Sequence, residues 1–266
     1  MELEVLVAAM GQEDCSLAEK MNITTAAVIA NQCDRWDYMK QNGIQMVSTG
    51  TRGVGINRNL ALQVSKADIL LFADDDVAYY DGALEGVVAA FEQLPDADVI
   101  FFGLDMTRDG KVFDKRRNKV RRVHIWNALR YGTARMAVRR SAVMEKRLSF
   151  TTLFGGGCKY GSGEDTVFIA DCIRAGLRAY SHDLVLGTCA KDSSSWFAGY
   201  NEKYFYDRGA MVACVFPRLK HLMKYHFARK LTKKQGVPMK KVLRYMNMGI
   251  KGYKTLKGYD QQETEL

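Results

Sequence analysis

The chain has 266 residues, 47% hydrophobic and 26% charged, a balance typical of a folded protein and not of a disordered one. Residues 1–10 are too acidic for a signal peptide and too briefly apolar for a membrane span, and no other segment reaches spanning length. Six scattered cysteines without a C-x-x-C pair indicate neither a zinc site nor a disulfide framework, so we expect a cytoplasmic protein with reduced thiols.

The net charge of +9 is unevenly distributed along the chain. Residues 208–259 contain fourteen Lys or Arg and no Asp or Glu, which leaves 25 basic and 30 acidic residues, a net charge of −5, in the remainder. This shift in composition predicts an N-terminal domain over residues 1–205 and a basic helical C-terminal extension over residues 206–266.

Strand and helix patterns alternate through the first half of the chain. Helical stretches are predicted from about residue 15, over 56–65 and over 81–93, and they separate strands over 4–9, 26–30, 45–48, 69–73 and 99–102. This alternation predicts an α/β fold with a mostly parallel sheet flanked by helices. Residues 108–122 predict a loop or hairpin, followed by a strand over 134–138 and a short helix over 141–147.

The acidic triplet Asp74-Asp75-Asp76 directly follows the buried strand predicted over residues 69–73. Ligands of open α/β sheets bind at the carboxyl ends of strands, and three adjacent carboxylates repel one another unless a cation neutralises them. Oxygen ligands of this kind suit Mg²⁺ or Mn²⁺ shared with substrate phosphates. For the triplet alone, a solvated acidic turn is an equally good interpretation.

The segment Gly53-Val54-Gly55 begins like a dinucleotide-binding fingerprint but has Arg58 in place of the third glycine. It also follows the third strand and not the first, so a Rossmann oxidoreductase is disfavoured. The glycines instead predict a tight turn into a helix, at whose N-terminus Asn57 and Arg58 face an anionic ligand.

A second cluster with chemical potential lies in residues 154–166. Five glycines in nine positions, 155–163, predict a mobile loop that closes over a substrate. Glu164 and Asp165 begin the helix that follows. Their alternative role is to stabilise the helix N-terminus, and from this segment alone that role is the stronger interpretation.

The order of these features resembles a family 2 glycosyltransferase with the GT-A fold, a Rossmann-like arrangement, over about residues 3–200. The matching pieces are the first strand, the turn 31–34, the segment 53–62, the triplet behind its strand, and Gly163-Glu164-Asp165 at the start of a helix. The resemblance implies that Asp76, with Asp74 beside it, holds Mn²⁺ or Mg²⁺ on the donor diphosphate. Asp74 and Asp75 then contact the ribose or the waters of the metal.

The resemblance also assigns two further roles, one for the residue that contacts the nucleotide base and one for the residue that acts as the catalytic base. The acidic run that usually follows the second strand is replaced by Asn31-Gln32-Cys33-Asp34, so Asp34 is the first candidate for the base contact and Asn31 the second. The Glu164-Asp165 pair supplies the catalytic base, which we assign to Asp165. Residues 192–197 are expected to line the acceptor or cover the diphosphate, or else to form a capped turn.

The implied activity is metal-dependent, inverting transfer of a sugar from a nucleotide-diphosphate donor, preferably a UDP-sugar, to an acceptor. The acceptor would be a saccharide, either free or linked to a lipid, in bacterial surface-polysaccharide synthesis. Two alternatives remain: a metal-dependent nucleotidyltransferase, which would release pyrophosphate, and a non-catalytic module that binds sugar nucleotides or membranes.

The basic C-terminal segment mixes Lys and Arg with apolar residues. Nucleic-acid binding is disfavoured because no reading module accompanies the charge. A solvated helical face is a second interpretation. We favour a patch that contacts anionic lipid, which places the protein peripherally at the inner face of the plasma membrane.

Overall fold

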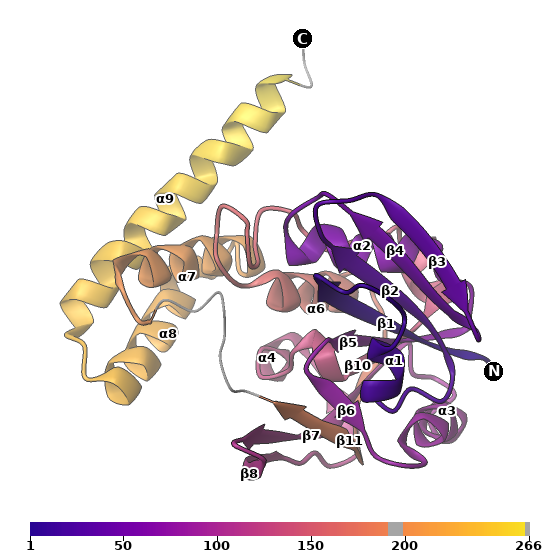
Figure 1. Ribbon diagram of the computed structural model, residues 1–266. Coiled ribbons are helices and arrows are strands. Elements are labelled where there is room, and N and C mark those ends of the chain that lie inside the picture. Colours follow the sequence, from indigo (N-terminus) through magenta and orange to yellow (C-terminus); the bar gives the residue numbers. More distant parts are fainter. Residues whose placement is uncertain (191–198, 264–266) are drawn as a thin grey trace. The chain divides into compact units, whose positions relative to one another are not determined.

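The computed structural model describes residues 1–190 and 199–263 (Figure 1). The chain divides into two compact units. The first, which we call the sheet unit, comprises Met1–Thr152 and Phe168–Ser194. The second, the helical unit, comprises Leu153–Val167 and Ser195–Leu266. Helix α6 (Glu164–Arg174) begins in the helical unit and ends in the sheet unit.

The sheet unit is built on one 11-stranded sheet, with the strand order β3-β4-β2-β1-β5-β10-β7-β11-β6 and with β8 on β7 and β9 on β11. The strands are β1 (Leu3–Met10), β2 (Ala26–Gln32), β3 (Asp37–Gln41), β4 (Ile44–Thr49), β5 (Ile69–Asp74), β6 (Val77–Tyr79), β7 (Val99–Arg108), β8 (Lys111–Arg116), β9 (Arg121–Val123), β10 (Met136–Arg139) and β11 (Ala179–Ala190).

Neighbouring strands from β4 to β5 run parallel, so their carboxyl ends meet at one edge of the sheet. Strand β10 is antiparallel to both neighbours, whereas β11 is parallel to β7. The α/β class predicted from the sequence is confirmed, and the expected hairpin over residues 108–122 forms from β7 and β8.

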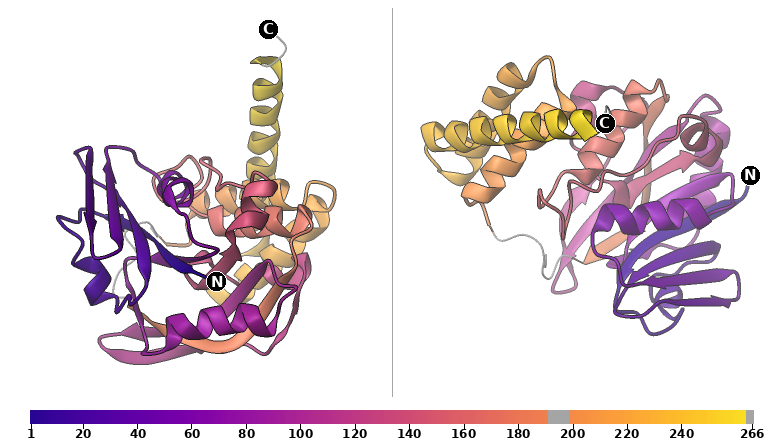
Figure 2. Two further views of the ribbon diagram at one scale, coloured as in Figure 1. Left: turned by 90° about the vertical axis from the view of Figure 1, so that its right-hand side faces the viewer. Right: turned by 90° about the horizontal axis from the view of Figure 1, so that it is seen from above.

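Both faces of the sheet are covered by helices, which can be followed in Figures 1 and 2. Side chains of β1 alternate between the two apolar cores: Val5 and Val7 enter one core, and Leu6 enters the other. The first core includes residues of α1 (Leu17–Lys20) and α3 (Ala83–Gln93). The second core includes residues of α2 (Val54–Val64), α5 (Arg140–Glu145) and α6. A short helix, α4 (Ile125–Ala128), follows β9.

The helical unit contains α7 (Glu202–Val215), α8 (Lys220–Gln235) and α9 (Met239–Glu263), which confirms the C-terminal helices expected from the sequence. Two glycines allow α7 and α9 to pack closely. A Cβ on Gly209 would lie 2.1 Å from the carbonyl oxygen of Met246, and one on Gly249 would lie 1.9 Å from that of Tyr206. The compositional boundary predicted after residue 205 falls inside α7.

The glycine-rich segment, for which the sequence predicts a mobile loop, is compact in the structure. It folds back on itself through hydrogen bonds between Gly155 N and Tyr160 O at 2.8 Å and between Tyr160 N and Leu153 O at 3.0 Å. The rings of Phe154 and Tyr160 stack with centroids 4.7 Å apart, and both side chains are buried. Gly161 N donates to Asp207 of α7 at 2.9 Å. Aromatic rings and backbone hydrogen bonds therefore hold this segment together in the structure, and its mobility stays a prediction.

Candidate functional site

The acidic triplet lies at the carboxyl edge of the sheet. Asp74 is the last residue of β5, and its register partner on β1 is Ala8. On the other side of β1, Ala9 pairs with Asn31 of β2, which in turn pairs with Ser48 of β4. The parallel register therefore brings residues from three separate predicted motifs to one edge.

Arg58 of α2 binds the triplet from the protein interior. Its guanidinium Nη2 donates to Asp74 Oδ1 at 2.7 Å, and the arginine is only 3% exposed. Gly55 makes this geometry accessible, because a Cβ there would lie 2.4 Å from the carbonyl oxygen of Thr151. Arg58 thus contacts a carboxylate of its own chain, and its contact with an anionic ligand stays a prediction.

Asn57 is also buried and serves the same edge. Its Nδ2 donates to the carbonyl oxygen of Ala9 at 3.1 Å, which ties the first turn of α2 to the end of β1. Gly53, at φ 119°, supplies the turn into α2 that the sequence predicted. Asn57 therefore stabilises the edge of the sheet in the structure as it stands.

The other two carboxylates of the triplet are exposed to solvent but carry an electrostatic strain. Desolvation by the surrounding protein raises the pKa of Asp76 to about 6, and the negative charge of Asp74 adds to this effect. Desolvation also raises the pKa of Asp75, whose Oδ2 accepts a hydrogen bond from Met10 N at 3.4 Å. These carboxylates therefore resist ionisation and would be stabilised by a nearby cation.

Cys189 contacts Asp76 across the sheet, a pairing that the sequence did not reveal. Strand β11 runs antiparallel to β6 with Cys189 opposite Val77, and Ala190 N donates to the carbonyl oxygen of Asp76 at 2.9 Å. The Cys189 thiol lies close enough to the Asp76 carboxylate to lower the pKa of that carboxyl, which partly offsets desolvation. Burial raises the pKa of this thiol to about 12, and the charge of Asp76 adds to that shift. The thiol therefore stays protonated next to the carboxylate.

The donor set at this edge suits a divalent cation shared with a substrate. Among the residues that the structure describes, no three His, Cys, Asp or Glu side chains are grouped closely enough to hold a metal ion by themselves. Mg²⁺ is commonly held by one or two carboxylates, with substrate phosphates and waters completing the shell. Asp74 and Asp76 fit that role, because the raised pKa of Asp76 marks a carboxylate that lacks a neutralising charge.

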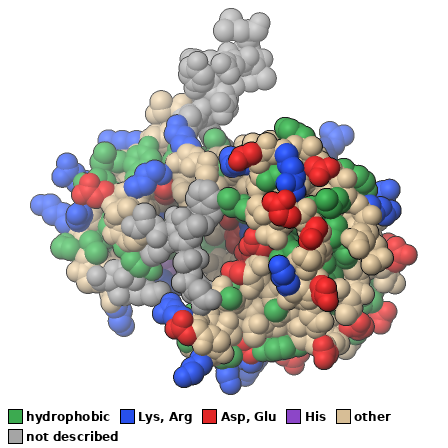
Figure 3. Space-filling model, viewed as in Figure 1, with side chains coloured by type: hydrophobic (Ala, Val, Ile, Leu, Met, Phe, Trp, Pro, Cys, Tyr) green, Lys and Arg blue, Asp and Glu red, His purple; other side chains and the backbone are tan. Residues whose placement is uncertain are grey.

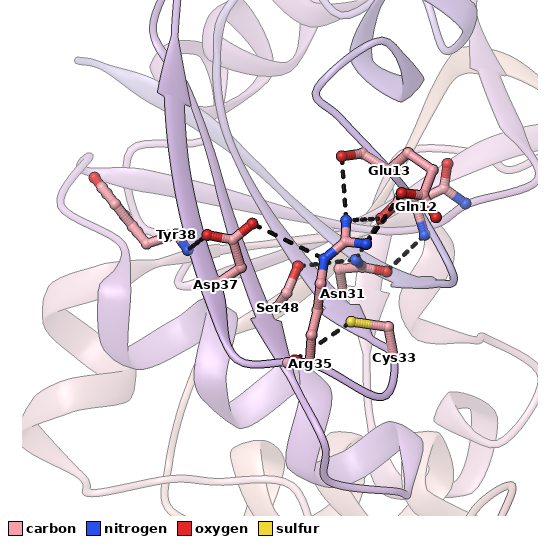
Figure 4. A network of polar contacts seen from close by, with 8 residues as sticks. All are labelled: Gln12, Glu13, Asn31, Cys33, Arg35, Asp37, Tyr38 and Ser48. Atoms are coloured by element: carbon pink, nitrogen blue, oxygen red, sulfur yellow. Dashed lines mark hydrogen bonds and ion pairs between the residues drawn. The ribbon is translucent and has the colours of Figure 1, made fainter.

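The turn after β2 is held by a polar network shown in Figure 4. Asn31 is fully buried; its side chain accepts from Gln12 N at 2.9 Å and donates to Gln12 O at 2.8 Å and to Ser48 Oγ at 2.9 Å. Arg35 forms an ion pair with Glu13 at 3.0 Å. Asn31 thus has each of its polar atoms engaged within the protein.

Asp34 has the opposite environment to Asn31. Its side chain is 97% exposed and pairs with Arg52 at 2.6 Å. An exposed pair of this kind is weak and can rearrange to admit a ligand. Of the two residues considered for the base contact, Asp34 is accessible to a ligand and Asn31 is committed to the fold.

Glu164 and Asp165 occupy the first turn of α6 and belong to the helical unit, whereas the acidic triplet belongs to the sheet unit. Both are half-buried. Glu164 Oε2 accepts a hydrogen bond from Gly163 N at 3.1 Å. Gly163 has φ 122°, and a Cβ there would lie 3.0 Å from Met211 Cγ, so the chain enters α6 in a conformation that requires glycine. Residues 192–197, the second candidate for contact with the acceptor, lie outside the described part of the chain.

The fold agrees with those of solved structures of S. aureus TarS. Residues 1–349 of S. aureus TarS in complex with UDP-GlcNAc superpose with a TM-score of 0.62 at 14% identity, over 99% of this chain and 92% of that one. The complex of the same protein with UDP gives 0.61 at 14% identity, over the same shares of the two chains. A longer TarS structure gives 0.56 at 14% identity, over 97% of this chain and 55% of that one. No curated protein sequence matches the chain significantly.

The mixed sheet flanked by helices and the C-terminal helices have the GT-A fold of these structures. Residues 24–150 match the family described as Glycosyl transferase family 2, a span that includes the turn after β2, α2 and the acidic triplet. The matched span covers slightly less than half of the chain, so the chain is similar to glycosyl transferase family 2 over these residues.

Proposed function

We propose that this enzyme transfers a sugar from a UDP-sugar to a saccharide acceptor in bacterial surface-polysaccharide synthesis, with a divalent cation and with inversion at the anomeric carbon. The observation that carries the proposal is the acidic triplet at the carboxyl edge, where the pKa of Asp76 is raised to about 6. The UDP and UDP-GlcNAc complexes of TarS, which shares the fold, support a uridine nucleotide.

The donor would bind along the edge from β2 to β5. Asp34 contacts the base, and Asp75 contacts the ribose. Asp76 and Asp74 hold Mn²⁺ or Mg²⁺, and Arg58 fixes Asp74 from the interior. When bound, the cation acts as a Lewis acid that stabilises the charge developing on the diphosphate leaving group. Because Arg58 pairs with Asp74, Asp76 is the carboxylate whose charge a bound cation would neutralise.

Asp165 would act as the catalytic base. It accepts the proton of the acceptor hydroxyl as the hydroxyl oxygen attacks the anomeric carbon and the bond to the diphosphate oxygen breaks. A single displacement of this kind inverts the anomeric configuration, as it does in inverting glycosidases. Glu164 supports the geometry, because its carboxylate accepts the N–H of Gly163 at the entry to α6.

The helical unit offers a surface suited to anionic lipid. Leu222 and Tyr225 on α8 are 67% and 50% exposed, and Arg229 is exposed four residues after Tyr225 on the same helix. Figure 3 shows Lys and Arg side chains, with hydrophobic side chains among them, around the outer rim of this unit. In the part of the chain that the structure describes, no helix combines the length and apolar character needed to cross a bilayer. Peripheral docking at the inner face of the plasma membrane would bring the enzyme to a lipid-linked acceptor.

Thermal unfolding with UDP-, GDP-, CDP- and dTDP-sugars, each with and without Mn²⁺, tests the proposal. Ligand at 100 times its Kd stabilises the folded state by about 2.7 kcal/mol. We expect stabilisation by a UDP-sugar only with Mn²⁺, its loss in Asp76→Ala, and its retention in Glu145→Ala, which removes an exposed acid paired with Lys146. Stabilisation by no sugar nucleotide would refute the donor site.

Product analysis and vesicle binding complete the test. Release of UDP supports sugar transfer, and release of pyrophosphate contradicts it.

For the membrane surface, Leu222→Ser with Tyr225→Ser should reduce co-sedimentation with phosphatidylglycerol vesicles. Val112→Ser, which changes a residue that is 42% exposed on β8 of the sheet unit, should not. Equal binding by both variants would remove α8 from the proposal.

A further inference from the structure

A second basic region lies in the sheet unit, apart from the basic C-terminal helices. Residues 108–135 contain ten Lys or Arg and two Asp. Strand β8 pairs with the C-terminal half of β7, from Leu104 to Arg108, whereas β9 pairs with the start of β11, from Ala179 to Ser181. The fold therefore brings only some of these charges near one another.

Arg135 is the buried member of this region. It is only 5% exposed, and its guanidinium donates to two backbone carbonyls, Phe102 O at 3.4 Å and Arg130 O at 2.9 Å. Its Nε is buried and has no hydrogen-bond partner among the described residues. A buried guanidinium satisfied by carbonyls and not by a carboxylate leaves a positive charge that the protein does not neutralise.

Two further arginines flank this buried charge. Arg130 and Arg135 both lie over the ring of Tyr131, at 4.9 and 5.0 Å from its centroid, and Arg130 is exposed. Arg116, at the end of β8, has a side chain that is 37% exposed. Burial lowers the pKa of Arg135 to about 10, and the charge of Arg116 lowers it further. We call Arg116, Arg130 and Arg135 the arginine cluster.

The nearby acids do not neutralise the cluster. Asp105, the buried carboxylate of β7, accepts from Arg117 Nη1 and Nη2 and from the hydroxyl of Tyr80 at 3.1 Å. Arg117 lowers the pKa of Asp105, as expected for a carboxylate held by a charged donor. Asp114 pairs with Arg116 at 3.2 Å, but it is half-exposed and is a single charge against three.

The cluster adjoins the donor edge. Arg116 pairs with Leu104 of β7, and two residues further along β7 Met106 pairs with Cys189 of β11. The residue after Cys189, Ala190, donates its N–H to the carbonyl oxygen of Asp76. Arg116 therefore lies within electrostatic range of both Asp76's partner and the buried Arg135. The donor diphosphate is assigned to the acidic triplet with its cation, so an anion at the arginine cluster belongs to a second molecule.

We propose that the arginine cluster binds a phosphate group of the acceptor, so that the acceptor is a phosphate-bearing saccharide. This inference rests on the proposed glycosyl transfer and specifies its acceptor. Arginine is suited to phosphate because its planar guanidinium donates two parallel hydrogen bonds. Arg116 and Arg130 present accessible guanidinium groups, and Arg135 supplies a fixed charge behind them. The phosphate positions the acceptor hydroxyl beside the donor.

Titration of inorganic phosphate into the full chain, at constant ionic strength, tests the site without requiring catalysis. The double variant Arg116→Gln/Arg130→Gln should bind phosphate at least tenfold more weakly than the wild type. Arg178→Gln, which changes a half-exposed arginine paired with Asp96, should bind it as the wild type does. Equal phosphate affinity in the double variant and the wild type would overturn the proposal.

Donor binding separates this proposal from the proposed function. UDP-sugar with Mn²⁺ should stabilise the double variant as much as the wild type; a parallel loss of UDP affinity would assign the cluster to the donor and overturn the proposal. Without phosphate, the double variant should melt at a higher temperature than the wild type, because like charges have been removed. If no donor binds the wild type, the proposed function fails, while the phosphate titration still reports on the cluster.

Two probes distinguish the source of the phosphate. A water-soluble sugar phosphate that binds through the cluster assigns the phosphate to the saccharide chain. The second probe is phosphatidylglycerol vesicles, added to a protein that carries Leu222→Ser and Tyr225→Ser. Vesicle binding that is lost when the arginine cluster is also substituted assigns the phosphate to a lipid carrier. Both results support a phosphate site. Binding of neither probe, in a wild type that binds UDP-sugar, would contradict it.

Discussion

Arg58 binds Asp74 from the protein interior. The arginine side chain is 4% exposed and the aspartate side chain 40%, and 2.7 Å separate Nη2 of Arg58 from Oδ1 of Asp74. The pair joins α2 to the last residue of β5. Arg58 neutralises Asp74, the first carboxylate of the triplet, from within the protein, so Asp76 would need a different cation to neutralise its charge. The sequence presented Arg58 and Asp74 as two separate binding motifs, whereas the structure makes them one.

Replacing Arg58 with methionine should destabilise the protein and weaken donor binding. The variant keeps the apolar packing but leaves Asp74 without its internal charge partner. Loss of one partner of a buried pair costs about 3–5 kcal/mol, and the partial exposure of Asp74 lowers our expectation to about 2 kcal/mol. Urea unfolding measures the change. Arg52→Met, which breaks the exposed pair with Asp34, should change stability by less than about 1 kcal/mol.

The raised pKa of Asp76 makes stability depend on pH. Because its pKa is about 6 in the folded protein against 3.8 ordinarily, the folded state holds the proton more tightly than the unfolded chain. The contribution is therefore favourable at acidic pH and is lost as the pH rises from about 4 past 6. Asp76→Asn should raise the Tm at pH 8 by about 2 °C and change it little at pH 4. An equal shift at both pH values would contradict the assignment.

Mn²⁺-dependent donor binding should follow the opposite trend with pH. Only the ionised carboxylate of Asp76 binds a cation well, so the affinity for a UDP-sugar with Mn²⁺ should fall as the pH drops below about 6. Calorimetric titration between pH 5 and 8 measures this dependence. An affinity independent of pH would place the cation elsewhere.

Asp34 and Asn31 should respond differently to substitution with alanine. Asp34→Ala removes an exposed carboxylate, so we expect weaker UDP binding and an unchanged Tm. Asn31→Ala deletes three hydrogen bonds inside the protein, at about 1 kcal/mol each, and should lower stability by about 2–3 kcal/mol. Unchanged UDP affinity in Asp34→Ala would return the base contact to Asn31 or to another residue.

Substitution of Asp165 with asparagine should separate binding from catalysis. A positioned base contributes ~10²–10⁴-fold to the rate, so kcat should fall by at least that lower factor while the donor still binds. Asp171→Asn, on the same helix and paired with Arg174 at 3.1 Å, is the matched control and should keep normal turnover. Near-normal transfer by Asp165→Asn, with a large loss in Glu164→Gln, would move the catalytic base to Glu164.

Gly249→Ala should destabilise the helical unit. The new Cβ would lie 1.9 Å from the carbonyl oxygen of Tyr206, and α7 and α9 could accommodate it only by separating. Overpacking of this kind costs about 1–3 kcal/mol. Circular dichroism during thermal unfolding measures the loss of helix. Gly50→Ala is the control, because a Cβ there would meet only Trp36 Nε1 at 3.4 Å.

The sequence by itself determined the order of strands and helices in the first half, the position of the acidic triplet behind a buried strand, and the glycine turn into α2. These features depend on local periodicity, which a short window of residues expresses fully. It did not reveal β3, whose residues are mostly exposed at the edge of the sheet and show no clear alternation. Nor did it reveal the packing that fixes residues 154–160, because glycine content reports conformational freedom and not the aromatic rings between the glycines.

Only the tertiary structure decided which polar residues act together. Cys189 meets Asp76 through the antiparallel register of β6 and β11, and Arg116 comes within range of Arg135 because β8 folds back on β7. Asp34 and Asn31 lie three residues apart in the sequence, but the fold exposes the first and buries the second. Such relationships depend on strand register and burial, which span 113 residues of chain between Asp76 and Cys189, and local sequence carries no signal for either.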